Sequence, residues 1–328
     1  MKYFRKDKNR LVCLLCSYYC KLKEGQVGIC GVNKNIGDKI ECLVYGYPAA
    51  MNVDPIEKKP LYHFLPDTKS FSLGTVGCNF RCLFCQNHGI SQEHNINKSV
   101  YYSPKDIVDM AVFYGCKTIS YTYNEPTIFY PYAKDCAIEA KKQGIKNIYV
   151  SNGFESLEVI DDMKDIIDAV NIDLKCFNEN YYKKELGGSL KQVLQNLKHF
   201  KKNCIWVEVT TLIVPTKNDS VEELTKIAKF IKEELGEFTP WHISAFHPDY
   251  KELNLPRTSF KSLKMAYDIA KKIGLKYVYI GNLSFDNHTK CPSCDEMLIK
   301  RNRFDVIENR ILNGKCPKCK YKIEGVFS

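Results

Sequence analysis

The sequence predicts an α/β protein whose core is a partial, open (βα)6-type barrel, with a small metal-binding segment at each end. Three observations support this fold class. Apolar, β-rich runs alternate with helical stretches through the middle of the chain, which is typical of a parallel sheet. These units number only six or seven in about 210 residues, too few for a closed eightfold barrel. Cysteines are paired at short spacing near both ends of the chain.

The order of the expected elements follows from hydrophobic periodicity. We expect strands at 71–76, 117–123, 147–151, 168–174, 204–213, 241–246 and 276–281, and helices at 104–113, 127–143, 189–201, 219–235 and 259–273. Ser103 followed by Pro104 is typical of a helix start, and the acids after Asp219 suit a helix N-terminus. The expected segments are 1–65, a cysteine-rich N-terminal segment; 66–286, the barrel core; and 287–328, a C-terminal zinc ribbon.

Composition favours a cytoplasmic metalloprotein. The charged N-terminus is not followed by an apolar segment, and no apolar run approaches 18 residues, so neither a secretory signal nor a membrane span is expected. Sixteen cysteines in such a chain favour metal sites over disulfides. The formal charge of +10 overstates the basic character because metal-bound thiolates are not counted, and scattered lysines indicate a solvated surface rather than a nucleic-acid site.

Three cysteines carry the strongest functional signal. Cys78, Cys82 and Cys85 have the spacing Cys-x3-Cys-x2-Cys, with Phe84 before the last of them. Three thiolates can hold one face of a [4Fe-4S] cluster and leave one iron without a protein ligand, whereas electron-transfer clusters are normally closed by four. The alternative is a zinc site completed by His88, but structural zinc prefers a closed set of four ligands.

This pattern resembles the signature of the radical S-adenosylmethionine (radical SAM) superfamily. The resemblance implies that SAM chelates the open iron and that the reduced cluster cleaves SAM to a 5′-deoxyadenosyl radical, which abstracts hydrogen from a substrate. A low-potential reductant such as ferredoxin or flavodoxin would then supply the electron. The open barrel is also the core that this superfamily would have.

Polar residues at the expected strand ends fit SAM binding. Glu125 in the run Tyr-Asn-Glu-Pro is the candidate acceptor for the SAM amino group, although a helix N-terminal acid is the alternative. Asp173 and Lys175 point to one side of a strand and could pair with each other; Lys175 could instead neutralise the SAM carboxylate. His242 is a candidate contact of the SAM ribose, the alternative being a structural histidine.

Further motifs bring the resemblance closer, to the radical SAM enzymes of the AmmeMemoRadiSam system, relatives of the pyruvate formate-lyase activating enzyme. They are Cys-Asn-Phe-Arg-Cys-Leu-Phe-Cys-Gln-Asn from residue 78, Thr-Tyr-Asn-Glu-Pro-Thr at 122–127, Ser-Asn-Gly at 151–153, Asp-Leu-Lys at 173–175, Asn-Asp-Ser at 218–220, Pro-Trp-His-Ile-Ser at 240–244 and Tyr-Val-Tyr-Ile-Gly-Asn at 277–282. The expected cofactor-binding residues are Phe84, Asn124, Glu125, Ser151, Asn152, Asp173, Lys175 and His242.

The closer resemblance also implies a monovalent cation held by Ser151 and Asp173 beside SAM. Val150 departs from the pattern because it stands where a further carboxylate is expected. Cys176 departs as well, and a buried structural cysteine is expected there rather than a thiol near the site. Proteins with AMMECR and Memo domains are the implied partners or substrates. Alternative functions are a glycyl-radical enzyme activase, an RNA-modifying enzyme and a non-catalytic iron–sulfur sensor.

Two further cysteine sets predict metal sites at the ends of the chain. Cys291, Cys294, Cys316 and Cys319 form two Cys-x2-Cys pairs, the pattern of a zinc ribbon. Cys13, Cys16, Cys20 and Cys30 form a second set of four, which suits either zinc, slightly favoured, or an auxiliary [4Fe-4S] cluster.

Overall fold

An open, mostly parallel sheet of eight strands forms the core of the protein. The computed structural model describes residues 3–283 and 285–328. The strands follow the chain in order: β6 (Ala50–Pro55), β7 (Lys69–Gly74), β8 (Thr118–Tyr121), β9 (Lys146–Ser151), β10 (Ala169–Asp173), β11 (Trp206–Ile213), β12 (Trp241–Ala245) and β13 (Val278–Gly281). Strands β7 to β13 are parallel, and β6 pairs antiparallel with β7 at one edge. The expected open α/β barrel is confirmed.

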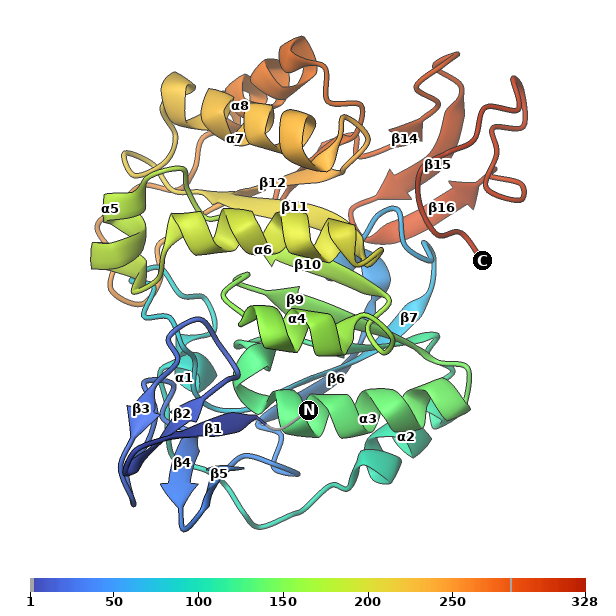
Figure 1. The fold of residues 1–328 in the computed structure, drawn as a ribbon. Coiled ribbons are helices and arrows are strands. Elements are labelled where there is room, and N and C mark those ends of the chain that lie inside the picture. Colours follow the sequence, from blue (N-terminus) through green and yellow to red (C-terminus); the bar gives the residue numbers. More distant parts are fainter. Residues whose placement is uncertain (1–2, 284) are drawn as a thin grey trace.

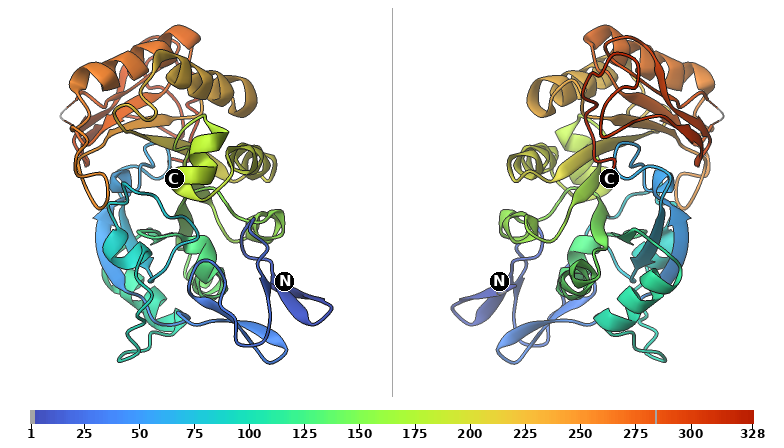
Figure 2. Two further views of the ribbon diagram at one scale, coloured as in Figure 1. Left: turned by 90° about the vertical axis from the view of Figure 1, so that its left-hand side faces the viewer. Right: turned by 90° about the vertical axis from the view of Figure 1, so that its right-hand side faces the viewer.

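Helices cover the outer face of this sheet (Figures 1 and 2). They are α2 (Pro104–Phe113), α3 (Tyr130–Lys142), α4 (Leu157–Met163), α6 (Leu190–Lys202), α7 (Val221–Phe230, continued by a π-helical turn at Ile231–Leu235) and α8 (Phe260–Ile273). Because consecutive strands are neighbours and crossovers share one hand, the helices fall on one side. The opposite, concave face is therefore available for a site at the carboxyl ends of the strands.

Serine residues begin most of these helices. Ser103, Ser156, Ser189, Ser220 and Ser259 each accept a hydrogen bond from a backbone N–H in the first turn of the helix that follows. At α2 the bond is reciprocal, since the Asp106 carboxylate also accepts from the Ser103 N–H, at 2.8 Å. The five expected helices are confirmed.

Two core elements were not expected from the sequence. Helix α4 has only seven residues, which is too short for a clear periodicity. Strand β6 contains Asn52, Asp54 and Pro55, which disfavour a strand by composition. Pro55 is tolerated because β6 is an edge strand, where the missing N–H of a proline does not interrupt hydrogen bonding between strands.

Small sheets lie at the two ends of the barrel strands (Figure 1). On the side of the carboxyl ends are β1 (Phe4–Asp7), β2 (Arg10–Cys13) and β3 (Lys21–Leu22), which form one sheet, and β4 (Asn33–Ile36) and β5 (Lys39–Cys42), which form a hairpin. Toward the amino ends, β14 (Thr289–Lys290), β15 (Met297–Asn302) and β16 (Asp305–Asn309) form a C-terminal sheet. Among the described helices, none is long and apolar enough to span a bilayer.

The loop between β6 and β7 closes the base of the barrel and holds the C-terminal sheet. The Arg301 guanidinium, from β15, donates to the Tyr62 carbonyl at 2.9 Å and lies 4.4 Å from the centroid of the Tyr62 ring. Phe64 forms a β-bridge with Val326, two residues from the end of the chain. The C-terminal sheet is thus fastened to the core through buried contacts.

Candidate active site

The three cysteines of the central motif line a cavity of about 530 Å³ at the carboxyl ends of the strands. They lie on the loop that follows β7. The Phe80 N–H donates to Cys78 Sγ at 3.3 Å, and the Ser91 hydroxyl, from the short helix α1 (His88–Ser91), lies 3.0 Å from Cys85 Sγ. Phe84 is buried in the same wall. Both ends of the motif are therefore held by hydrogen bonds to sulfur.

Nearly all of the predicted cofactor-binding residues line this cavity. Besides Phe84 they are Asn124 and Glu125 after β8, Ser151 and Asn152 at the end of β9, and Asp173 and Lys175 at the end of β10. Val150, the departure from the expected cation site, also lines it. Consecutive strand ends bring these residues together, as expected for a (βα) barrel.

Asp173 and Lys175 form an ion pair at the cavity. Lys175 Nζ lies 2.8 Å from Asp173 Oδ2, which confirms the predicted pairing. Burial lowers the pKa of Lys175, but the neighbouring charges of Asp173 and Cys82 outweigh this effect and raise it overall. The lysine therefore provides a fixed positive charge beside the cysteines.

Glu125 belongs to a buried network that the sequence did not reveal. Its Oε1 accepts hydrogen bonds from the Thr127 and Ser151 hydroxyls, and its Oε2 accepts from the Asn152 N–H. Glu155, not predicted as a site residue, is fully buried beside it, and its Oε1 lies 3.3 Å from the Thr127 hydroxyl oxygen and 2.5 Å from the Ser151 hydroxyl oxygen. Glu155 Oε2 has no hydrogen-bond partner among the described residues. Ser151 thus contacts carboxylates of its own network, while Asp173 is paired with Lys175.

Two buried carboxyls so close together cannot both be charged at low cost. Burial raises the pKa of Glu125, against the hydrogen bonds that it accepts. Burial also raises the pKa of Glu155, and the charge of Glu125 raises it further. The pair therefore holds a proton at neutral pH.

Asn124 and Asn152 position the cysteine loop. Asn124 Nδ2 donates to the Gly77 carbonyl at 2.8 Å, and its Oδ1 accepts from the Thr75 N–H. Asn152 Nδ2 donates to Asn79 Oδ1 at 2.7 Å. Their amides thus join the ends of β8 and β9 to residues on both sides of Cys78.

The predicted contact between His242 and the SAM ribose finds no support in this structure. His242 does not line the cavity; its Nε2 lies 2.6 Å from Glu208 Oε2 in the base of the barrel. Glu208 also accepts from the backbone N–H groups of Tyr62 and His63. Burial opposes ionisation of Glu208, but the hydrogen bond and charge of His242 outweigh it and lower the pKa of Glu208. His242 is two residues too early in β12, and Ser244, on the same face nearer the strand end, lines the cavity instead.

Lys59 is a further cavity residue that sequence reasoning missed. Its Nζ lies 2.6 Å from Asp54 Oδ2 and 4.7 Å from the centroid of the Tyr123 ring. Burial lowers the pKa of Lys59, against its interaction with Asp54. Asn282, which follows β13, also lines the cavity. The Tyr-Ile-Gly-Asn motif could have identified Asn282 as a site residue. Lys59 follows Lys58 in a short lysine run that belongs to no motif, so the sequence contains no signal for it.

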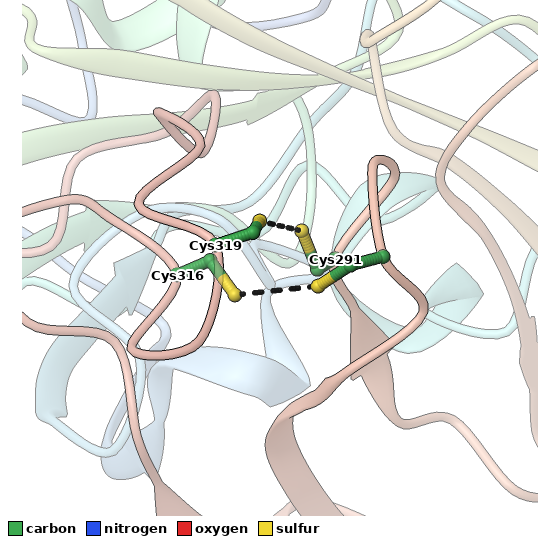
Figure 3. Close-up of side chains that lie close together, drawn as sticks. Cys291, Cys316 and Cys319 are labelled. Carbon is green, nitrogen blue, oxygen red and sulfur yellow. Dashed lines mark hydrogen bonds between the residues drawn. The ribbon is translucent and has the colours of Figure 1, made fainter.

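The C-terminal cysteines form a compact four-sulfur site, at which Figure 3 shows Cys291, Cys316 and Cys319. Cys291 Sγ lies 3.6 Å from Cys319 Sγ, Cys294 Sγ lies 3.8 Å from Cys316 Sγ, and all four sulfurs lie within 4.8 Å of one another. A zinc ion with Zn–S bonds of about 2.3 Å places tetrahedral sulfurs roughly 3.8 Å apart. The site therefore fits one tetrahedral metal ion, as predicted for a ribbon.

The other predicted cysteines lie outside the cavity lining. Cys13, Cys16 and Cys30 are buried and Cys20 is partly exposed, around the junction of β2 with the turns that follow it. Cys176 is fully buried, and its Sγ lies 3.6 Å from the Asn178 carbonyl. This position agrees with a structural role for Cys176.

Comparisons with known proteins support the family suggested by this geometry. Residues 72–231 match the Radical SAM superfamily. Uncharacterized protein MJ0808 of Methanocaldococcus jannaschii is 42% identical over 333 residues, which cover 100% of this chain and 99% of that protein. Pyruvate formate-lyase 1-activating enzyme of Escherichia coli K12 is 25% identical over 175 residues, 51% of this chain and 71% of the enzyme.

A solved structure supports the fold independently. A radical SAM methyltransferase from Sphaerobacter thermophilus superposes with a TM-score of 0.52 at 13% identity, covering 66% of this chain and 67% of that one. This likeness concerns the fold alone. The match over residues 72–231, the sequence relatives and the three cysteines at the cavity establish that the chain belongs to the radical SAM superfamily.

Proposed function

We propose that this protein reductively cleaves SAM at a [4Fe-4S] cluster held by Cys78, Cys82 and Cys85 and abstracts hydrogen from a substrate. The observation that carries the proposal is the convergence of these cysteines with Glu125, Ser151 and the Asp173–Lys175 pair on one cavity. The cluster, when bound, supplies the electron that splits SAM into methionine and a 5′-deoxyadenosyl radical.

The donor set fits such a cluster. All three thiols line the cavity. Among the described residues, the four ribbon sulfurs lie within 4.8 Å of one another, whereas the sulfurs of Cys78, Cys82 and Cys85 do not form such a close group. Thiolates on different irons stand farther apart than thiolates on one ion. Two of the sulfurs also have neutral hydrogen-bond donors, which stabilise metal-bound thiolates.

The remaining cavity residues match the chemistry of SAM. Lys175 provides a positive charge for the SAM carboxylate, and Asp173 and Glu125 provide carboxylates within the same cavity for its amino group. Since Oε1 and Oε2 of Glu125 already accept hydrogen bonds from protein groups, Asp173 is the better-placed acceptor of the two. We assign a supporting role to Glu125, with Asn124 and Asn152 positioning the cysteine loop.

The test is SAM cleavage by anaerobically reconstituted protein. We expect 5′-deoxyadenosine after dithionite and SAM are added, and none above background from Cys82→Ala. Cys204→Ala, which removes an exposed cysteine, should cleave SAM like the wild type. A fully loaded, reducible cluster that yields no deoxyadenosine would refute the proposal and favour an iron–sulfur sensor.

Similarity to the pyruvate formate-lyase activating enzyme favours a second candidate, a glycyl-radical enzyme activase. Its substrate would be a backbone glycine of a partner protein. Cells grown in deuterium oxide can supply fractionated protein, nucleic acid and small molecules as deuterated substrates. Deuterium transferred into deoxyadenosine from the protein fraction would support the activase. Transfer from a nuclease-sensitive fraction would instead indicate an RNA-modifying enzyme, and transfer from neither leaves a small-molecule substrate.

The proposed function also requires an electron donor, and it includes protein partners and a metal ion at the C-terminal cysteines. Ferredoxin or flavodoxin would supply the electron, and proteins with AMMECR and Memo domains would receive the product or serve as substrates. For the ribbon we propose zinc, because its four sulfurs have the spacing of one tetrahedral ion.

A further inference from the structure

We propose that Cys13, Cys16, Cys20 and Cys30 hold a second [4Fe-4S] cluster rather than zinc. This inference goes beyond the proposed function and does not depend on it. It rests on the convergence of four thiols, on their spacing, and on their position beside the loop that carries Cys78.

The four thiols converge although they come from an 18-residue stretch with little regular structure. The Cys13 N–H donates to the Cys20 carbonyl at 2.9 Å, which closes the first turn. The sulfurs of Cys20 and Cys30 lie 3.7 and 3.8 Å from one point, the position that a Cβ on Gly28 would occupy. The Tyr19 N–H donates to the Cys16 carbonyl at 3.0 Å, so Cys16 lies in the turn that leads to Cys20.

Their spacing differs from that of the ribbon site. Within residues 3–283 and 285–328, the ribbon cysteines are the only group of three or more potential ligands whose atoms lie within 4.8 Å of one another. The N-terminal thiols are more widely spaced, as are Cys78, Cys82 and Cys85. One tetrahedral zinc would require sulfurs roughly 3.8 Å apart. Four thiolates on four different irons require the wider arrangement.

A buried side-chain amide donates a hydrogen bond to one of these sulfurs. The side-chain amide of Asn33 donates to Cys30 Sγ at 3.4 Å. Such a donor stabilises the negative charge of a metal-bound thiolate in a site where three of the four cysteines are buried.

The proposed cluster would lie next to the active-site loop. Gly77, the residue before Cys78, packs so closely on the N-terminal segment that a Cβ on it would lie 2.6 Å from the Cys30 carbonyl oxygen. The ring of Tyr18 packs on that of Phe154, with centroids 5.2 Å apart, and Phe154 in turn packs on Phe80 of the cysteine loop, at 5.3 Å. Four cysteines leave no open iron, which suits electron transfer rather than substrate chemistry.

We therefore assign the second cluster to electron delivery. A one-electron donor of the ferredoxin or flavodoxin class would reduce it from the 2+ to the 1+ state, and the same electron would pass to the active-site cluster. No atom or proton moves in this step, and the donor is the species oxidised.

Metal analysis of the full chain tests the site. In Cys78→Ala/Cys82→Ala/Cys85→Ala, reconstituted anaerobically with iron, sulfide and zinc, we expect about four irons, four sulfides and one zinc per chain, with an EPR signal on reduction. Adding Cys16→Ala should remove the iron. Adding Cys42→Ala instead should retain it, because Cys42 is a neighbouring cysteine outside the set. Two zincs without iron in the triple variant would overturn the proposal, as would loss of iron on Cys42→Ala.

A reductant comparison tests the role. Cys16→Ala in the otherwise native chain should retain SAM cleavage with dithionite, which is small enough to reach the active-site cluster directly. With reduced flavodoxin its rate should fall at least tenfold. Equal rates with flavodoxin would overturn the electron-delivery role. If Cys16→Ala retains the ribbon zinc and its activity with dithionite, misfolding is excluded as the cause of a slower rate with flavodoxin. The metal analysis shows whether the N-terminal cysteines hold a cluster even if no variant cleaves SAM.

Discussion

The carboxylates of Glu125 and Glu155 share the hydroxyl of Ser151, whose Oγ lies 2.9 Å from Glu125 Oε1 and 2.5 Å from Glu155 Oε1. Both acids are buried, Glu125 at the wall of the cavity and Glu155 behind it, and in the described part of the chain neither forms an ion pair with a lysine or an arginine. A retained proton, rather than a counter-ion, therefore compensates their charge.

This shared proton predicts a pH dependence of stability. The pKa of Glu155 rises from 4.5 to about 8 on folding, so folding takes up a proton between these values and stability falls as the pH rises through them. Glu155→Gln should flatten that fall, because its amide is neutral at every pH. Thermal unfolding of both proteins at pH 5.5, 6.5 and 7.5 checks this. Exposed Glu222→Gln should keep the wild-type slope, and a Glu155→Gln slope equal to the wild type's would contradict the shared proton.

Lys175 should contribute directly to SAM binding. Loss of a hydrogen bond to a charged group costs about 1.5–3 kcal/mol, so Lys175→Met should raise the Kd for SAM roughly ten- to hundredfold. Calorimetric titration of the reconstituted protein measures it. Lys134→Met removes a comparably buried ion pair with Asp162, outside the cavity lining, and should leave the Kd unchanged. An unchanged Kd in Lys175→Met would exclude the lysine from SAM binding.

Gly77 should be essential for joining the N-terminal segment to the cysteine loop. Its φ is +89°, and a Cβ would lie 2.6 Å from the Cys30 carbonyl oxygen and 2.8 Å from Val32 Cγ1. Gly77→Ala should therefore lower the melting temperature and reduce iron incorporation. Gly115→Ala is the matched control, because Gly115 has φ +67° but no atom within 4 Å of the added Cβ. It should show only the backbone cost of about 1–2 kcal/mol; equal effects of the two changes would refute the packing argument.

Loss of the ribbon metal should loosen the base of the barrel as well as the ribbon. Cys316→Ser should remove one zinc per chain and free β15, and with it the hydrogen bond from Arg301 to the Tyr62 carbonyl. Hydrogen exchange should then accelerate in 287–328 and around residues 61–65, while the strand ends at the cavity keep their protection. Faster exchange confined to the ribbon would show that the base is stable without it.

Periodicity and motif position were sufficient to predict much of the core. All seven parallel strands appear, because buried strands produce continuous apolar runs. Strand ends also identify Glu125, Ser151, Asp173 and Lys175, since parallel strands end at one edge.

Depth within the barrel could not be predicted in the same way. His242 and Ser244 share a face of β12, and only the tertiary structure shows which one reaches the cavity and which one reaches Glu208. Glu155 follows a turn, and its approach to Glu125 depends on the fold of that turn. Lys59 reaches the cavity from the unexpected side, because the loop after β6 passes across the barrel.

The contacts of Tyr62 with Arg301 and of Phe64 with Val326 determine when the base of the barrel can form during synthesis of the chain. These contacts join residues more than 230 positions apart, so they cannot form until Arg301 and Val326 have left the ribosome. Until then the strands of the barrel can pair in the order of their synthesis, but the loop at the base of the barrel lacks its contacts with Arg301 and Val326. The cysteine loop is therefore synthesised well before the residues that hold the base of the barrel, and the emergence of Arg301 and Val326 is the event that fixes the base.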